Sequence, residues 1–105
     1  MPLLNLTKEN FLDEAIRSKG RILMNFWAPW CAPCRAFAPV IDSIAKDDYE
    51  DLKVCNVNVE EEPEIASVFN VMRVPTLVVM EGGLTLATSV GFRPRHEVVE
   101  FINGL

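Results

Sequence analysis

The sequence has few cysteines, no excess of positive charge and no long apolar run, and each absence argues against a class of protein. Three cysteines are too few to cross-link a small secreted protein that depends on disulfides for its stability. The low number therefore favours a reducing, cytoplasmic setting. A formal net charge of −5 argues against nucleic acid as a partner, because phosphate binding requires a basic face. The longest apolar runs are of strand length, so we expect no membrane-spanning helix.

We expect no targeting segment, and the sequence shows no repeat or linker. Residues 1–5 lack the basic start and the apolar core of a secretory signal peptide. We find no internal repeat and no low-complexity tract. A chain of 105 residues has room for one modest core, so we expect a single domain over residues 1–105.

The apolar pattern predicts alternating helices and strands. We expect helices over about residues 7–18, 31–46, 63–69 and 94–102, and strands over about residues 22–27, 52–59, 76–80 and 84–90. A crossover helix implies that the first two strands are parallel, whereas Glu81-Gly82-Gly83 is typical of an antiparallel hairpin. Residues 47–51 are expected to form a loop. The predicted fold class is therefore α/β, a mixed sheet with helices on both faces.

The first expected helix has a defined start. Thr7 can cap it, but Asn10 stands where a full capping box has Glu or Gln, so we expect no such box. Helical spacing places four apolar residues on one face: Phe11, Leu12, Ala15 and Ile16.

A pair of cysteines separated by two residues lies between a predicted strand and a predicted helix. The apolar run Ile22–Trp27 precedes Cys31-Ala32-Pro33-Cys34, and apolar residues at helical spacing follow. Such a pair can close a small disulfide ring or bind a metal, and the strand-to-helix context favours redox chemistry. A helix N-terminus stabilises negative charge, so we expect Cys31 to be the better stabilised thiolate and the more exposed of the two.

Structural zinc is the alternative to redox chemistry for this pair. Zinc normally takes four ligands, and the other candidates, Cys55 and His96, do not stand at ligand spacing. Cys55 lies in an apolar strand and is expected to be a core residue, whereas His96 is expected to be a solvated surface residue. We therefore predict no metal site.

Several motifs follow one another along the chain: Phe26-Trp27-Ala28-Pro29-Trp30-Cys31 with Cys34, Pro39 inside a helix, Val74-Pro75-Thr76, Gly83 and Gly91. In this order and at this spacing they resemble the thioredoxin family over essentially the whole chain. The resemblance implies the thioredoxin fold and a protein-disulfide reductase. It also implies no bound cofactor, with electrons from NADPH through a thioredoxin reductase. The implied partners are that reductase and disulfide-containing client proteins, and the implied state is a monomer.

The resemblance also implies roles for individual residues. Cys31 attacks the client disulfide, and Cys34, buried behind it, resolves the mixed disulfide. Pro75 is cis, faces the disulfide, and its neighbour's backbone pairs with an extended client. The resemblance further implies a docking patch around the sulfur, formed by Trp30, Ala32, Val74, Gly91 and Phe92. Pro33 restricts the conformation of the ring that the disulfide closes, and Arg35 keeps a cation near the two sulfurs. Phe92 is bulkier than the family's usual residue, and it either shapes the client groove or is an ordinary surface aromatic.

The chain departs from the family pattern behind this site. Most members have a buried aspartate where this chain has Asn25, and commonly a lysine where it has Asn56. An amide cannot accept a proton at neutral pH, so we predict slower resolution of the mixed disulfide than in a typical member. We also expect the two amides to hydrogen-bond each other.

Two other functions remain open. The first is an oxidant or isomerase, which Pro33 and the missing signal peptide disfavour. The second is a binding subunit that uses the same surface without turnover, and the altered interior keeps that possibility open.

Overall fold

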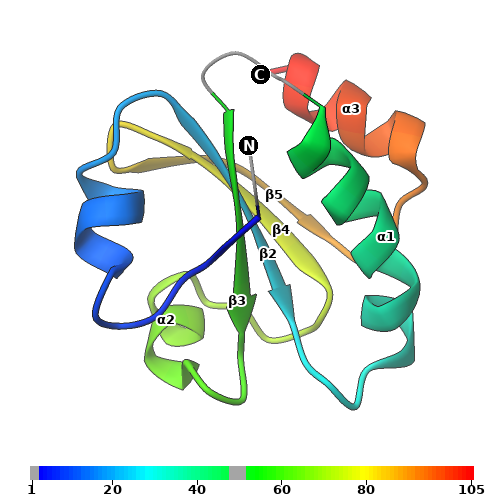
Figure 1. The fold of residues 1–105 in the computed structure, drawn as a ribbon, viewed down its shortest axis with the longest axis horizontal. Helices are drawn as coiled ribbons and strands as arrows, with labels where there is room; N and C mark the ends of the chain where they lie inside the picture. Colours follow the sequence, from blue (N-terminus) through cyan, green and yellow to red (C-terminus); the bar gives the residue numbers. More distant parts are fainter. Residues whose placement is uncertain (1–2, 48–51) are drawn as a thin grey trace.

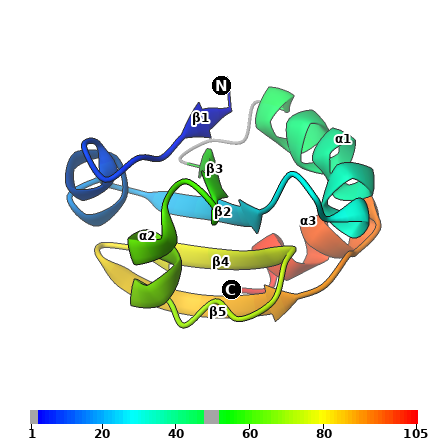
Figure 2. The same cartoon turned by 90° about the horizontal axis from the view of Figure 1, so that it is seen from below.

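The computed structural model describes residues 3–47 and 52–105 and has a five-stranded sheet at its centre, in the order β1-β3-β2-β4-β5. The strands are β1 (Leu4–Asn5), β2 (Arg21–Trp27), β3 (Leu52–Asn58), β4 (Thr76–Glu81) and β5 (Leu84–Val90); Figure 1 labels β2 to β5, and Figure 2 also labels β1. The helical elements are η1 (Leu12–Ile16), α1 (Ala32–Lys46), α2 (Pro63–Val68) and α3 (Arg95–Asn103).

The predicted mixed sheet is confirmed. Strands β1, β3 and β2 run parallel, whereas β4 and β5 are antiparallel to their neighbours. The expected hairpin joins β4 to β5. Its two central residues, Gly82 and Gly83, have φ of 60° and 80°, a conformation that glycine adopts without steric cost.

Helices cover both faces of the sheet, as Figures 1 and 2 show. Side chains alternate along each strand, so one face of the sheet packs against α1 and α3 and the other against η1 and α2. Leu23 of β2 joins Phe37 and Val98 in the first core cluster, whereas Met24 joins Ala15 and Ile65 in the second.

The amino-terminal segment differs from the prediction in two ways. First, Leu4 and Asn5 form an unpredicted edge strand that pairs with Cys55 and Asn56 of β3. Second, the helical element expected over about residues 7–18 is a π-helix over Leu12–Ile16, in which the N–H of Arg17 donates to the carbonyl of Leu12. This wider turn does not keep the α-helical face, and Leu12, expected inside, is 53% exposed.

Thr7 and Asn10 cap this segment reciprocally, so the expected absence of a capping box is wrong. The N–H of Thr7 donates to Oδ1 of Asn10 over 2.8 Å, and the N–H of Asn10 donates to Oγ1 of Thr7 over 3.3 Å. Asn10, although shorter than the usual Glu or Gln, can accept the N–H of Thr7 because its own Nδ2 donates to the carbonyl of Asn5, which holds the amide in place.

The remaining boundaries agree with the prediction to within a residue or two. Of the loop expected over residues 47–51, only Asp47 lies within the described residues; it ends α1 and forms an ion pair with Arg95. Within the described residues, no helix combines the length and apolar character needed to cross a bilayer.

Candidate active site

The first turn of α1 holds both cysteines of the pair. Strand β2 ends at Trp27, a short loop follows, and Cys31 is the N-cap of α1. Sγ of Cys31 accepts the backbone N–H of Cys34 over 3.2 Å, and the two residues form a disulfide. Pro33 lies in the first helical turn, where its missing N–H costs no hydrogen bond. A sulfur that accepts a helix N-terminal N–H is placed where negative charge is stabilised.

The two cysteines differ little in exposure. Cys31 is 5% exposed and Cys34 is 3% exposed, so Cys31 is the more exposed of the two, as expected, but both residues are buried in this disulfide form. The cause is packing from outside α1, because Trp27, Val59 and Val74 lie against the pair. Trp27 is thus an aromatic residue that packs beside the site.

The Val74–Pro75 peptide lies next to the disulfide and is cis, as expected. The carbonyl oxygen of Val74 is 3.6 Å from Sγ of Cys31. The carbonyl of Pro75 accepts the N–H of Gly91 over 2.8 Å, which ties the cis-proline loop to the end of β5. Gly91 has a φ of 99°, a backbone conformation that strains any other residue.

Four residues of the expected docking patch are at least partly exposed to solvent. Trp30 is 66% exposed and Phe92 is 48% exposed, while Ala32 is exposed and Val74 half-buried. The Phe92 ring packs against the buried Phe37 of α1, with ring centroids 5.4 Å apart. Phe92 is therefore held against the body of the protein and still presents about half of its surface to solvent.

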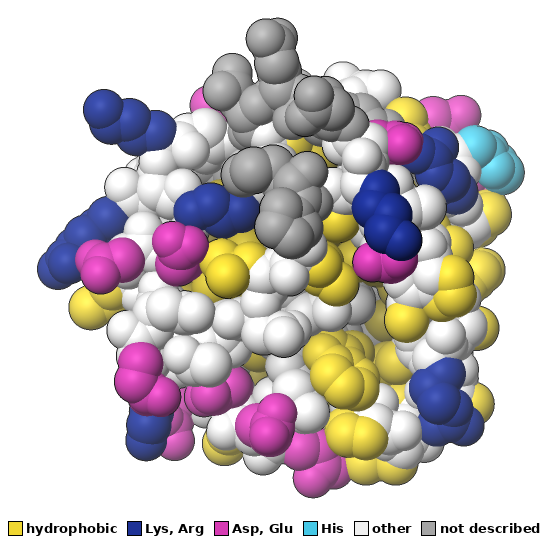
Figure 3. Space-filling model, in the orientation of Figure 1, with side chains coloured by type: hydrophobic (Ala, Val, Ile, Leu, Met, Phe, Trp, Pro, Cys, Tyr) yellow, Lys and Arg dark blue, Asp and Glu magenta, His cyan; other side chains and the backbone are white. Residues whose placement is uncertain are grey.

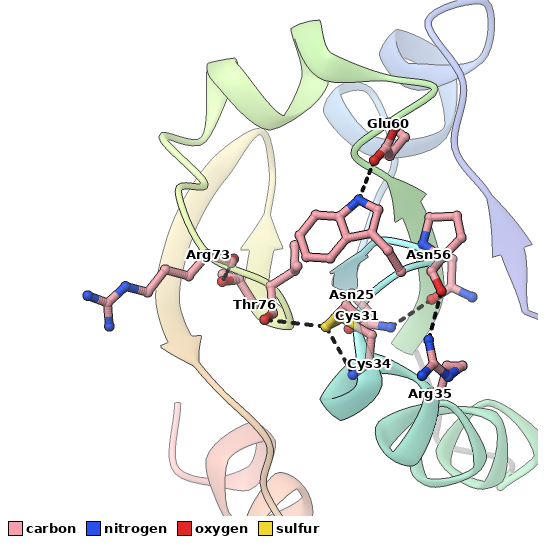
Figure 4. The surroundings of a disulfide bond; sticks show 11 residues. Asn25, Cys31, Cys34, Arg35, Asn56, Glu60, Arg73 and Thr76 are labelled. Carbon is pink, nitrogen blue, oxygen red and sulfur yellow. Dashed lines mark hydrogen bonds between the residues drawn. A yellow bond between two sulfur atoms is a disulfide. The ribbon is translucent and has the colours of Figure 1, made fainter.

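Two side chains near the disulfide are held by polar contacts. The indole N–H of Trp30 donates to the carboxylate of Glu60, a residue that the sequence analysis did not single out. The acidic run that follows β3 was the available signal, but it is equally typical of a solvated turn. The guanidinium of Arg35 donates to the carbonyl of Pro29 over 2.9 Å, which keeps this cation beside the loop (Figure 4).

Asn25 and Asn56 form the expected hydrogen bond. Nδ2 of Asn25 donates to Oδ1 of Asn56 over 3.1 Å, across paired positions of β2 and β3 (Figure 4). Alternation along β2 places Asn25 on the same face as Leu23, the face that α1 covers. Asn25 is 3% exposed, and its Oδ1 has no hydrogen-bond partner among the described residues.

The zinc alternative finds no support in the geometry. Cys55 is fully buried in the core on the η1 and α2 side, and burial raises the pKa of its thiol to about 12. His96 is exposed on α3. Among the described residues, no group of three or more His, Cys, Asp or Glu side chains could hold a metal ion.

The disulfide joins the N-cap of α1 to the first turn of this helix, and it lies beside the cis-proline loop and an exposed tryptophan. This arrangement defines a dithiol–disulfide exchange site. The class of protein that carries such a site on a mixed sheet is a thiol–disulfide oxidoreductase.

Comparison with known proteins agrees with this class. The family model described as Thioredoxin matches residues 2–104. The chain is 38% identical to the thioredoxin of Bacillus subtilis (strain 168) over 103 residues, which cover 98% of this chain and 97% of that protein. It is 43% identical to the thioredoxin of Listeria monocytogenes serovar 1/2a over 98 residues, 93% of each chain. The chain therefore belongs to the thioredoxin family, and it is a thiol–disulfide oxidoreductase.

Proposed function

We propose that this chain reduces disulfides of client proteins, with Cys31 as the attacking thiol and Cys34 as the resolving thiol. The observation that carries the proposal is the position of Cys31, whose sulfur caps α1 and lies 3.6 Å from the carbonyl of Val74. A thiolate there is stabilised by the helix N-terminus, and an extended client can pair with the backbone beside it.

The exchange proceeds in two steps. The Cys31 thiolate attacks one client sulfur, forming a mixed disulfide and releasing the other client sulfur as a thiolate. Cys34 then loses its proton and attacks Sγ of Cys31, which forms the Cys31–Cys34 disulfide and releases the second client thiolate. Two electrons pass from the protein to the client. A thioredoxin reductase that draws on NADPH returns two electrons to the pair, and no metal or bound cofactor takes part.

The surrounding residues have supporting roles in this proposal. Pro33 restricts the ring, Ala32 lies within it, and Arg35 keeps a cation near the sulfurs. Client contact is assigned to the surface around the disulfide: Trp30, Val74, Pro75, Gly91 and Phe92. Asn25 and Asn56 form the neutral interior behind the pair. We further propose that the protein acts as a monomer in a reducing compartment, the cytoplasm.

The reduction potential of the Cys31–Cys34 pair tests the direction of the reaction. We expect equilibration with a glutathione buffer to give a value at or below about −250 mV, where cytosolic reductants lie. A value above about −200 mV would overturn the reductase assignment and identify an oxidant or isomerase.

A trapping experiment tests the roles of the two thiols. Cys34→Ser should accumulate the mixed disulfide between Cys31 and a client, while Cys31→Ser should form none. Reduction of insulin driven by dithiothreitol should be lost in both variants. If the cellular function survives in Cys34→Ser, the chain is a binding subunit and not a reductase.

A further inference from the structure

Some Lys and Arg side chains of this protein form ion pairs with carboxylates, and others form none among the described residues. The sequence has ten Lys and Arg residues. Six of them form ion pairs with carboxylates: Arg17, Arg21, Lys46, Lys53, Arg93 and Arg95. The other four pair with no carboxylate of the described residues: Lys8, Lys19, Arg35 and Arg73. Two of these four belong to segments next to the disulfide: Arg35 follows Cys34, and Arg73 precedes Val74, whose carbonyl lies 3.6 Å from Sγ of Cys31.

Arg35 and Arg73 lie on opposite sides of the Cys31–Cys34 pair (Figure 4). Arg35 uses one N–H group on the carbonyl of Pro29. The guanidinium of Arg73 is exposed and has no hydrogen bond or ion pair among the described residues. Each guanidinium N–H group of Arg73 is therefore available to a partner.

The backbone of Arg73 is fixed relative to the reactive sulfur. Oγ1 of Thr76 donates to the carbonyl of Arg73 over 2.6 Å. The next residue, Val74, has its carbonyl oxygen 3.6 Å from Sγ of Cys31. A client sulfur that reacts with Cys31 therefore arrives beside Val74, one residue from Arg73.

Strand geometry sets which client residues Arg73 can reach. An extended chain rises about 3.3 Å per residue, so client residues within two positions of the attacked cysteine lie within about 7 Å of it. Arg73 also borders a surface depression of about 140 Å³, lined on its other sides by Trp30, Val59, Val71, Met72 and Val74. A client strand that runs over this depression passes Arg73, whose unpaired side chain extends outward from its rim (Figure 4).

Acidic side chains lie on the other side of this depression, where Trp30 contacts Glu60. Figure 3 shows that Asp and Glu side chains gather along the lower edge of the view, near α2 and the carboxyl end of β3. Glu60, in that region, is occupied by the indole of Trp30. A client carboxylate is therefore attracted to the Arg73 side of the site and repelled from the Glu60 side.

We propose that Arg73 recognises a client carboxylate placed within about two residues of the cysteine that Cys31 attacks. The preferred clients are therefore disulfides flanked by Asp or Glu on the side that faces Arg73. This inference rests on the proposed reductase function and specifies the class of its substrates.

Matched disulfide peptides test the inference. One set carries Asp beside the reactive cysteine, before or after it, a second set carries Lys at the same positions, and a third carries Gln. Each rate constant for reduction by the dithiol protein is divided by the rate constant with dithiothreitol, which removes intrinsic differences between the peptide disulfides. At one of the two positions, we expect the Asp peptide to be reduced about threefold faster than the Lys peptide. This ratio of the Asp to the Lys rate constant should fall towards one at high salt.

Four variants test whether Arg73 causes the difference in rate between the Asp and Lys peptides. Arg73→Gln should bring the ratio to about one, Arg73→Lys should largely retain it, and Arg73→Glu should invert it. Lys19→Gln is the matched control, because it removes an unpaired cation at the opposite end of β2 and should keep the wild-type ratio. Equal ratios in Arg73→Gln and wild type would overturn the inference, as would a wild-type ratio of one at both positions. If wild type reduces none of the three sets, the reductase function itself is wrong.

Discussion

Asn25 and Asn56 face each other across the parallel strands β2 and β3, with Nδ2 of Asn25 3.1 Å from Oδ1 of Asn56. Both groups are neutral, so the interior on the α1 side of the sheet carries no charge at this pair. A buried charge without a partner is costly, and an amide pair avoids that cost. The pair also removes any proton acceptor at these two positions, which has a kinetic consequence.

Asn25→Asp should speed the resolving step. Burial disfavours the charged form and raises the pKa of the new carboxyl group, so that it can exchange a proton with Cys34 near neutral pH. We expect the mixed disulfide to decay at least about tenfold faster, because a positioned acid–base group contributes rate factors of this order or more. Stopped-flow decay of a mixed disulfide with a fluorescent client measures this rate.

The control for this experiment is Asn25→Ala, which removes the amide without supplying an acid and should not speed the decay. The Asp variant should also lose stability as pH rises from about 4 through the raised pKa, since its folded state holds the proton more tightly than the unfolded chain. Unchanged resolution and unchanged thiol titration in Asn25→Asp would show that the amide pair is kinetically neutral.

The buried thiol of Cys55 should make the stability of the oxidised protein fall in alkali. Burial raises its pKa from 9.0 to about 12, so the folded state keeps a proton that the unfolded chain loses above about pH 9. The stabilisation is complete below pH 9 and is lost as pH rises towards 12. At pH 10.5 we expect a loss of about 2 kcal/mol.

Urea unfolding of the oxidised protein between pH 8 and pH 10.5 measures this loss, because Cys31 and Cys34 do not titrate as a disulfide. Cys55→Ala provides the comparison and should show a decline smaller by that amount. In the native dithiol protein, iodoacetamide should label Cys31 and leave Cys55 unmodified until denaturant is added. Equal declines in the two proteins would contradict the assignment to Cys55.

The contact between Phe37 and Phe92 should contribute to stability beyond simple burial. The rings are tilted by 59° with centroids 5.4 Å apart, a geometry typical of favourable aromatic pairs. A double-mutant cycle with Phe37→Leu and Phe92→Ala should give a coupling of about 1 kcal/mol in urea unfolding. Leu84→Ala, at a residue that is 70% exposed, should show no coupling with Phe37→Leu.

The same Phe92→Ala variant separates the two interpretations of this residue. If Phe92 forms part of the client surface, KM for a protein client should rise while the rate with a small disulfide stays the same. An unchanged KM would leave Phe92 as an aromatic that only packs on Phe37.

Asn10→Ala should destabilise the amino-terminal segment. It removes the acceptor for the N–H of Thr7 and the donor to the carbonyl of Asn5. We expect a loss of about 1 kcal/mol in urea unfolding, as for other helix-capping side chains. Asn10→Asp keeps the acceptor and should recover part of that loss, whereas equal losses in the two variants would contradict the cap.

Much of the fold was predictable because it depends on local signals. The apolar run of β2, the helical spacing of α1 and the glycines at 82 and 83 each report on a few neighbouring residues. The family motifs added the cis peptide before Pro75, which Val-Pro-Thr alone does not predict. By contrast, β1 has two residues and shows no period, so its pairing with β3 could not be recognised.

The sequence by itself determined the order of most elements and the place of the cysteine pair, because periodicity tells which side of an element is buried. Periodicity does not tell which residue of another strand, helix or loop will contact that side. Strand register brought Asn25 to Asn56, the turn after β3 brought Glu60 to Trp30, and packing from Val59 and Val74 covered Cys31. Each of these contacts joins segments distant in the chain, so only the tertiary structure decided them.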